Sequence, residues 1–371
     1  MIYLDHAATT KISDVALETY METARRFFGN TESLHDTGTD AACLLDMCRK
    51  KWAELLAVPK EGLIFTSGGT ESNQLAIETA LLHTTKKKIV VSPLEHASIW
   101  QKLAQLKKRG YTVCVFPVSR AGEIDFAALE ELLTDETALL IVQHVNSETG
   151  AVQDAERVQR LAEKKKILLH MDLVQSFGKA DFRPNGVTSF SISSHKIYGP
   201  KGTGLLYMDP SRIWQKEMPD VHHENGYRAG TIDLPAISAF TAAACAIMEK
   251  YPAEFARIDA FKKELVQKLA PQIKILSKEN ASPYILGMIL PHALGEEALL
   301  YFSKNGLQIS TSSACTLRDT MPSRALLAMG YTKEEIERVI RFSFGASNHM
   351  QQIEPIRQIL TSFLAKGSER G

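Results

Sequence analysis

From Leu63 onward, short apolar runs alternate with longer stretches in which apolar residues recur at helical spacing. Residues 138–145 (ALLIVQHV) are almost continuously apolar, whereas residues 99–109 have a helical pattern. Continuous apolar strands are typical of a parallel sheet buried on both faces, and their alternation with helices is typical of α/β proteins. We therefore predict an α/β fold: a large domain with a mainly parallel sheet covered by helices, beside a smaller α+β domain.

The same pattern predicts where the domains divide. Ser13-Asp14 forms a helix start, and residues 40–56 form a second amphipathic helix. Helices predicted at 237–250 and 254–269 are separated by Tyr251-Pro252, and a chain of 371 residues exceeds the size of one core. We expect a large domain of residues 14–250, and a small domain of residues 1–13 and 251–371.

Charge and composition exclude some partners. Lys+Arg (43) equals Asp+Glu (43), so the chain lacks the strongly basic footprint of a nucleic-acid binder. The basic clusters at 86–88, 107–109 and 164–166 are each predicted to lie in the last turn of a helix, where cations meet the negative end of the dipole. No stretch has the apolar length of a membrane span, and residues 1–5 do not resemble a signal peptide, so we expect a cytoplasmic protein.

The five cysteines are odd in number and widely spaced, which fits neither a disulfide framework nor a zinc motif. No metal site is therefore predicted. Cys315 lies in a run of small polar residues and is predicted to be a loop thiol, which a nearby cation can activate. Arg341 lies in a strand-like stretch and suits the capture of a carboxylate, although a surface ion pair is an equal alternative.

Residues 189–204 (SFSISSHKIYGPKGTG) are the stretch around which the candidate chemistry is arranged. Their first half alternates Phe190 and Ile192 with serines, which predicts a short strand with one face in water. Lys196 follows that strand, and a desolvated lysine is a nucleophile toward carbonyls. An exposed lysine in a surface turn is the alternative.

Polar residues also follow the other predicted strands. Ligands of open parallel sheets bind at the carboxyl ends of the strands. There the chain has a Gly-rich turn suited to a phosphate, an aromatic ring, a carboxylate and a lysine, which together are what pyridoxal phosphate (PLP) needs. Taken singly, each residue has a structural explanation as a helix cap, a turn or a core histidine. The residues concerned are Gly69 and Thr70, His96, Asn146, Asp172 with Gln175, and His195 with Lys196.

Several motifs resemble those of the NifS-like cysteine desulfurases, PLP enzymes of the fold-type I, class V aminotransferase superfamily. They occur in family order over nearly the whole chain. They are YLDHAATT (3–10), TSGGTESN (66–73), LEHASI (94–99), HMDLVQSFGK (170–179), SSHKIYGPKG (193–202), RAGT (228–231), SSACT (312–316) and RFSFG (341–345).

The resemblance implies a role for each matching residue. Lys196 would attach covalently to PLP, Asp172 would pair with the pyridine nitrogen, and Gln175 would contact the ring hydroxyl. His96 would stack on the ring and help to move protons, and Arg341 would bind the substrate carboxylate. Gly69, Thr70, Ser193 and His195 would hold the phosphate, together with Thr231 of the neighbouring subunit in a homodimer with shared sites. Cys315 would accept the sulfur of L-cysteine, leaving alanine, and pass it to an acceptor protein for iron–sulfur or other thio-cofactor assembly.

Three positions depart from the family pattern. Ser147 stands where a second asparagine is usual, which leaves Asn146 as the candidate substrate-binding residue in this stretch. His222-His223 replaces a Gly-rich stretch, and His6 occupies a position that is often asparagine or tyrosine.

Two other functions remain open. One is a different PLP reaction on this fold, such as transamination or selenocysteine or C–S lyase chemistry, which needs no loop thiol. The other is a non-enzymatic dimer that docks sulfur carriers, and such a dimer would not bind PLP.

Overall fold

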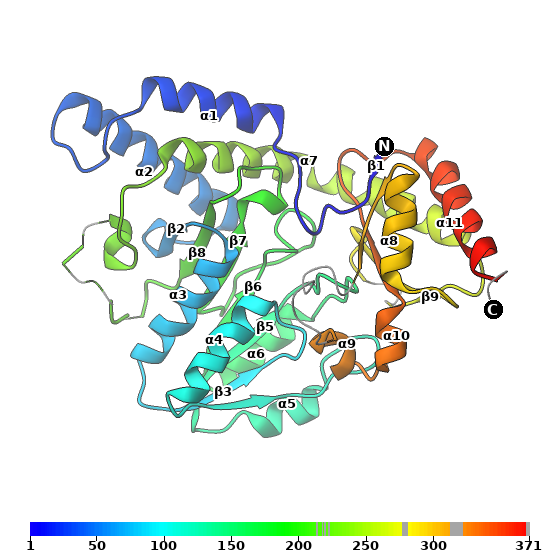
Figure 1. Cartoon of the computed structure of the whole chain (residues 1–371). Coiled ribbons are helices and arrows are strands. Elements are labelled where there is room, and N and C mark those ends of the chain that lie inside the picture. The colour runs from blue at the N-terminus through cyan, green and yellow to red at the C-terminus, as the bar shows by residue number, and fades with distance from the viewer. Residues whose placement is uncertain are drawn as a thin grey trace.

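The computed structural model describes residues 1–212, 214–216, 218, 220–221, 223–276, 281–311 and 322–365, with the backbone of 366–368. Its elements form two groups, one around a large sheet and one that includes α8 and α11 (Figure 1). Within these described ranges, no helix is long and apolar enough to cross a membrane.

The large sheet has seven strands in the order β2-β8-β7-β6-β5-β3-β4. Only β8 runs against its neighbours, so the predicted mainly parallel sheet is confirmed. Every residue of the central strands β5, β6 and β7 is buried, so both faces of the sheet are covered there. Its strands are β2 (Leu63–Thr66), β3 (Lys88–Val91), β4 (Thr112–Val115), β5 (Thr137–Gln143), β6 (Leu168–Asp172), β7 (Ser189–Ser193) and β8 (Gly204–Met208). The helices of this group are α1 (Asp14–Arg26), α2 (Asp36–Leu56), α3 (Gly69–Leu82), α4 (Ala97–Lys108), α5 (Phe126–Leu132) and α6 (Ala155–Lys164).

The second group is built on two small sheets. One has the order β12-β13-β10-β9, and the other pairs β1 with β11 in parallel. Leu4, just after β1, packs in one apolar cluster with Leu286 and Phe342, so the N-terminal segment belongs to this core. The exact division at residues 13 and 250 remains a prediction. The elements are β1 (Ile2–Tyr3), β9 (Lys274–Ile275), β10 (Ile285–Ile289), β11 (Leu307–Gln308), β12 (Ser310–Thr311), β13 (Val339–Ser343), α8 (Gly295–Lys304), α9 (Arg324–Ala328), α10 (Lys333–Glu337) and α11 (Ile353–Ser368).

One long helix, α7 (Leu234–Gln267), joins the two groups, and it corrects the predicted break at Tyr251-Pro252. Its 34 residues continue through Pro252. Phe240 packs in the core around the large sheet, and Phe261 packs in the second core. Burial at both ends therefore outweighs the hydrogen bond that an internal proline removes.

Two further expectations are wrong. All five residues of β7 are buried, because α3 packs against this strand, so the serines of β7 do not face water. The 86–88 lysine cluster lies beyond the end of α3 at Leu82, and Lys88 begins β3. The other two clusters do reach the last turns of α4 and α6.

Candidate active site

The carboxyl ends of β5, β6 and β7 lie side by side and bring the predicted polar residues together. Asp172 at the end of β6 is in register with Gln143 on one neighbouring strand and Ser191 on the other. The chain then leaves β7 through a short 3₁₀ turn, Ser194–Lys196. The parallel strands thus place the carboxylate and the lysine at one edge of the sheet, as the strand-end rule predicts.

Asp172 is only 1% exposed, and both of its carboxylate oxygens accept hydrogen bonds. The Val174 backbone N–H donates to Oδ1 at 2.9 Å, and Asn73 Nδ2 donates to Oδ2 at 2.9 Å. A second carboxyl group lies nearby: burial and the charge of Asp172 raise the pKa of Glu95 well above its usual value. Glu95 therefore ionises less readily than an ordinary glutamate, and Asp172, held by two hydrogen bonds, is the carboxylate suited to pair with a cationic ring nitrogen.

A buried polar network holds Asn73 in place. Its Oδ1 accepts from Ser191 Oγ at 2.5 Å and lies 3.0 Å from His170 Nε2. Burial lowers the pKa of His170 to about 3, so the ring is neutral. Because Asn73 Oδ1 can only accept, His170 donates from Nε2, and its Nδ1 accepts from Ser189 Oγ at 2.9 Å. This network did not appear among the predicted site residues, although the alternating serines of β7 carried the signal.

The N-terminus of α3 fits a phosphate group. Gly68 precedes the helix with φ +149°, and it supplies no side chain to cap the first backbone N–H groups. A Cβ at Gly69 would lie 2.7 Å from Val174 Cγ2, so a larger residue would crowd this turn. Exposed N–H groups and the helix dipole favour an anion here. Thr70 lies in the first turn of α3, and Ser193 ends β7, which packs against that helix.

The N-terminal segment lies against Lys196. The Lys196 ammonium donates to Ala7 O at 2.6 Å and to Ala8 O at 2.8 Å, and Gln175 Nε2 donates to the same Ala7 oxygen at 2.9 Å. His195 Nδ1 lies 3.1 Å from Thr9 Oγ1. These contacts hold Lys196, Gln175 and His195 against residues 7–9.

The two histidines of the site are held mainly neutral. Burial, followed by the charge of Lys196, lowers the pKa of His195 to about 4. Desolvation also lowers the pKa of His96, with Asp172 opposing the shift and Lys196 adding to it. His96 caps α4 and its Nδ1 lies 2.9 Å from Ser98 Oγ. Because Nδ1 accepts from the Ser98 backbone N–H at 3.2 Å, the neutral His96 ring carries its hydrogen on Nε2, which can donate it.

Arg341 lies in β13 and is 8% exposed. Its guanidinium donates from Nη1 to Ser147 O at 3.0 Å and from Nη2 to Asp5 Oδ1 at 2.8 Å. Its Nε is buried and has no hydrogen-bond partner among the described residues. A substrate carboxylate could therefore exchange with Asp5 at this guanidinium.

Three other predicted site residues have different settings. Asn146 is 2% exposed, and its side chain organises the following turn: Oδ1 accepts from Glu148 N and from Thr149 N and Oγ1, and Nδ2 donates to Leu94 O. Thr231 is exposed in the segment before α7. Cys315 lies outside the described residues. The preceding strand β12 pairs with β13, with Ser310 opposite Arg341.

The departures from the family pattern also have defined contacts. His223 Nδ1 lies 3.4 Å from Glu32 Oε1, whereas His222 lies outside the described residues. His6 Nε2 lies 3.1 Å from Ser347 Oγ, and burial followed by the charge of Lys179 lowers the pKa of His6 to about 4.

This fold and this arrangement of residues define a class V aminotransferase. The sequence pattern of the family described as "Aminotransferase class-V" matches residues 2–356. The putative cysteine desulfurase NifS of Bacillus subtilis (strain 168) is 38% identical over 97% of this chain and 94% of its own length. A solved structure of a NifS-like protein superposes with a TM-score of 0.91 and 27% identity, covering 98% of this chain and 99% of that one. The structure of SspA in complex with cysteine has a TM-score of 0.82 and 28% identity, over 93% and 99% of the two chains.

The chain therefore belongs to the NifS-like cysteine desulfurases within the class V aminotransferase family. The predicted family, α/β fold and enzyme class are confirmed. The roles of individual site residues remain predictions.

Proposed function

We propose that this desulfurase works with PLP held at the edge of the large sheet, between Asp172 and the N-terminus of α3. PLP supplies an electron sink for the substrate α-carbon. Asp172 pairs with the ring nitrogen, Gln175 faces the ring hydroxyl, and His96 stacks on the ring. Lys196 is the lysine that attaches to the cofactor. The phosphate is bound by Gly69, Thr70, Ser193 and His195.

The substrate is L-cysteine, and three side chains act on it. Arg341 binds its carboxylate by exchanging partners with Asp5. Lys196 would act as the base that takes up and returns the proton of the substrate α-carbon. The Cys315 thiolate would attack the substrate sulfur: an S–S bond forms as the Cβ–S bond breaks, and Cβ keeps the electron pair and takes a proton. Cys315 would then be a persulfide, and the product would leave as alanine.

The working unit is a cytoplasmic homodimer in which Thr231 of one subunit completes the phosphate site of the other. An acceptor protein then collects the persulfide sulfur for iron–sulfur or other thio-cofactor assembly. This part of the proposal is supported by the RAGT motif and by the exposed position of Thr231 before α7.

A single observation supports the proposal most strongly: the sheet brings a buried carboxylate, a lysine and an open helix N-terminus to the ends of adjacent strands. Asp172 and the 3₁₀ turn with Lys196 follow neighbouring strands β6 and β7, and α3 packs against β7. PLP needs these three kinds of group together.

The test is to incubate the purified protein with PLP, L-cysteine and a reductant, and to measure alanine and sulfide. We expect Cys315→Ala to keep its bound PLP and its binding of cysteine but to form no persulfide and release little sulfide. Cys43→Ala is the control, because Cys43 is an exposed free cysteine on α2. Normal sulfide release by Cys315→Ala would refute the assigned role and indicate another PLP reaction.

A further inference from the structure

Thr231 lies at the end of residues 223–231. A buried ion pair between Glu224 of this segment and Arg49 of α2 fastens the segment to its own subunit. We propose that the Arg49–Glu224 pair positions residues 223–231, so that Thr231 is presented to the PLP phosphate of the partner subunit. This inference rests on the shared homodimer site proposed above.

The pair covers the free edge of the large sheet. Within the part of the chain that the structure describes, β2 is the last strand of the sheet, and β8 is the strand with which it pairs. On its other edge, Arg49 Nη1 donates to Leu63 O, and the Phe65 backbone N–H donates to Glu224 Oε2 at 2.6 Å. The two side chains thus satisfy backbone groups that an edge strand otherwise leaves open.

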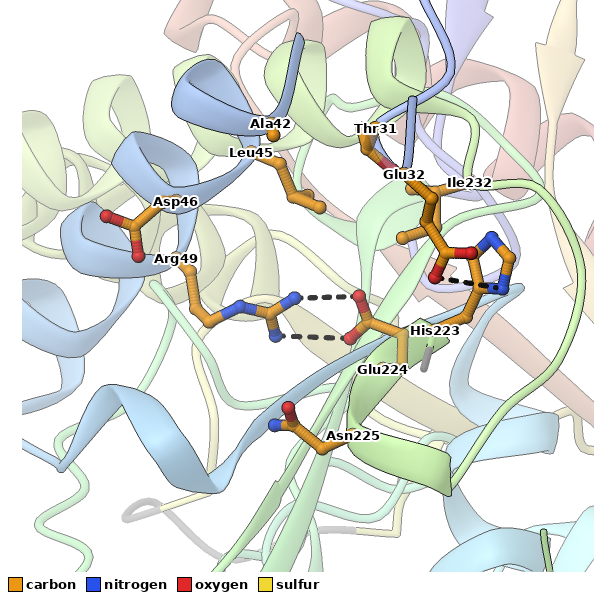
Figure 2. A pocket seen from close by; sticks show the side chains of 10 residues that line it. All are labelled: Thr31, Glu32, Ala42, Leu45, Asp46, Arg49, His223, Glu224, Asn225 and Ile232. Carbon is orange, nitrogen blue, oxygen red and sulfur yellow. Dashed lines mark hydrogen bonds and ion pairs between the residues drawn. The ribbon is translucent and has the colours of Figure 1, made fainter. Parts of the chain in front are cut away.

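The geometry of the pair is that of a strong, desolvated contact. Arg49 Nη2 lies 2.7 Å from Glu224 Oε1, and Nη1 lies 3.1 Å from Oε2, so the contact is bidentate (Figure 2). The Glu224 side chain is 1% exposed and that of Arg49 is 14% exposed. Removing one partner would leave a buried, unpaired charge, which is strongly unfavourable.

The backbone at Glu224 depends on this contact. Glu224 and Asn225 have φ values of 44° and 57°, in the left-handed region that favours glycine. Such conformations persist only where surrounding contacts determine them. Because Glu224 is held through Arg49 and Phe65, the ion pair fixes the path by which the chain enters residues 226–231.

A second contact fastens the same segment near Thr231. Arg228 Nε lies 3.1 Å from Glu71 Oε1, and Glu71 Oε2 in turn accepts from the Ser67 backbone N–H. Both contacts therefore tie residues 223–231 to residues 63–71, the segment that leads into the phosphate turn. Thr231 follows three residues after Arg228, and α7 begins at Leu234. The β2 edge of the sheet thus supports the phosphate turn of its own subunit. It also supports the segment with Thr231, which contributes to the partner's site in the proposed dimer.

The first experiment measures PLP affinity. Glu224→Gln keeps the size of the side chain but removes its charge, and we expect the dissociation constant of PLP to rise about tenfold. Arg49→Lys keeps the charge but loses the bidentate geometry, so it should have an intermediate effect and serves if Glu224→Gln does not fold. Glu156→Gln is the matched control, because the Glu156–Arg160 pair is about 70% exposed on both sides; its PLP affinity should be unchanged.

The second experiment separates positioning in the partner from local damage. Hybrid dimers combine one chain that keeps Lys196 with one chain that carries Lys196→Ala, so the visible absorbance of covalently bound PLP reports one site only. When Glu224→Gln is placed on the Lys196→Ala chain, we expect the reporting site in the other chain to bind PLP more weakly. When it is placed on the Lys196-containing chain, that site should lose less PLP affinity, since only the support of its own phosphate turn is altered.

Thr231→Ala in the same hybrids distinguishes the two possible failures. In one outcome, Thr231→Ala weakens PLP binding in the partner chain, but Glu224→Gln has no effect there or acts only within its own chain. This outcome would overturn the inference about Arg49–Glu224, while the shared site would stand. If Thr231→Ala has no effect across the dimer, the shared site itself is wrong, and the inference falls with it.

Discussion

Several imidazole rings near the proposed PLP site are neutral because the fold desolvates them. Burial lowers the pKa of His170 to about 3 and, with neighbouring lysines, lowers those of His195 and His6 to about 4. Neutral rings can donate from one nitrogen and accept at the other, and the network from Ser189 through His170 and Asn73 to Asp172 requires this. Asp172 is therefore oriented by groups that carry no charge.

Asn73→Ala should weaken both the fold and the binding of PLP. The substitution leaves His170 Nε2–H and Asp172 Oδ2 without their partner in a buried site, so the free energy of unfolding should fall by about 1–3 kcal/mol. Urea denaturation measures this change, and a fluorescence titration measures PLP affinity. Gln358→Ala, which removes an exposed amide bonded to Glu354, is the control. An unchanged affinity for PLP would show that Asn73 does not orient Asp172.

Lys179 makes stability depend on pH. Burial, followed by repulsion from Lys196, lowers the pKa of Lys179 to about 7 in the folded protein. In the unfolded chain the pKa is about 10.4. Between these two values the unfolded state binds more protons, so the free energy of unfolding should rise as pH increases from about 7 to about 10.

Lys179→Met should flatten the rise of the free energy of unfolding with pH. It should stabilise the protein most at low pH, below about 7, where Lys179 is protonated in both the folded and the unfolded protein and the folded protein holds a buried charge. Urea titrations at several pH values measure the effect, and Lys107→Met on the exposed end of α4 is the control. An equal pH dependence in Lys179→Met and the unchanged protein would contradict this assignment.

Among the elements, those specified by local pattern were predictable from the sequence. The apolar run of β5 and the Ser13 cap of α1 appear as predicted, because burial on both faces and a side-chain acceptor are local requirements. The water-facing side of β7 was wrongly predicted because its serines bind Asn73 and His170, residues distant in sequence. The strand-end rule predicted that Asp172 and Lys196 lie together at one edge of the sheet, as the structure shows, and their roles remain predictions. It could not predict the contacts of Asn73 or Glu224, since these depend on partners that only the fold brings together.

The continuity of α7 gives a prediction at the same scale. Pro252 is exposed inside this helix and has no N–H to donate. Pro252→Ala should restore a helical hydrogen bond and raise the free energy of unfolding by about 1–3 kcal/mol. Thermal denaturation measures the change, with Pro271→Ala beyond the helix as the control. A lower melting temperature for Pro252→Ala would mean that the proline is needed where it lies.

In the molecule as a whole, the N-terminal segment joins the two cores at the proposed site. Ala7 accepts from Lys196 and Gln175 of the large-sheet group, and its own N–H donates to Ser343 Oγ of β13 at 2.8 Å. Asp5 holds Arg341 of the same strand. The proposed site therefore lies where both groups of elements meet, and each group contributes some of its residues.

The proposed chemistry depends most directly on Lys196 as the lysine that holds PLP. Borohydride reduces the C=N bond between a lysine and PLP to a stable pyridoxyl group, which mass spectrometry of the digested protein can locate. We predict one pyridoxyl group, on the peptide that contains Lys196, and none after Lys196→Ala. A pyridoxyl group on Lys179 or another lysine, or no labelled peptide at all, would contradict the account.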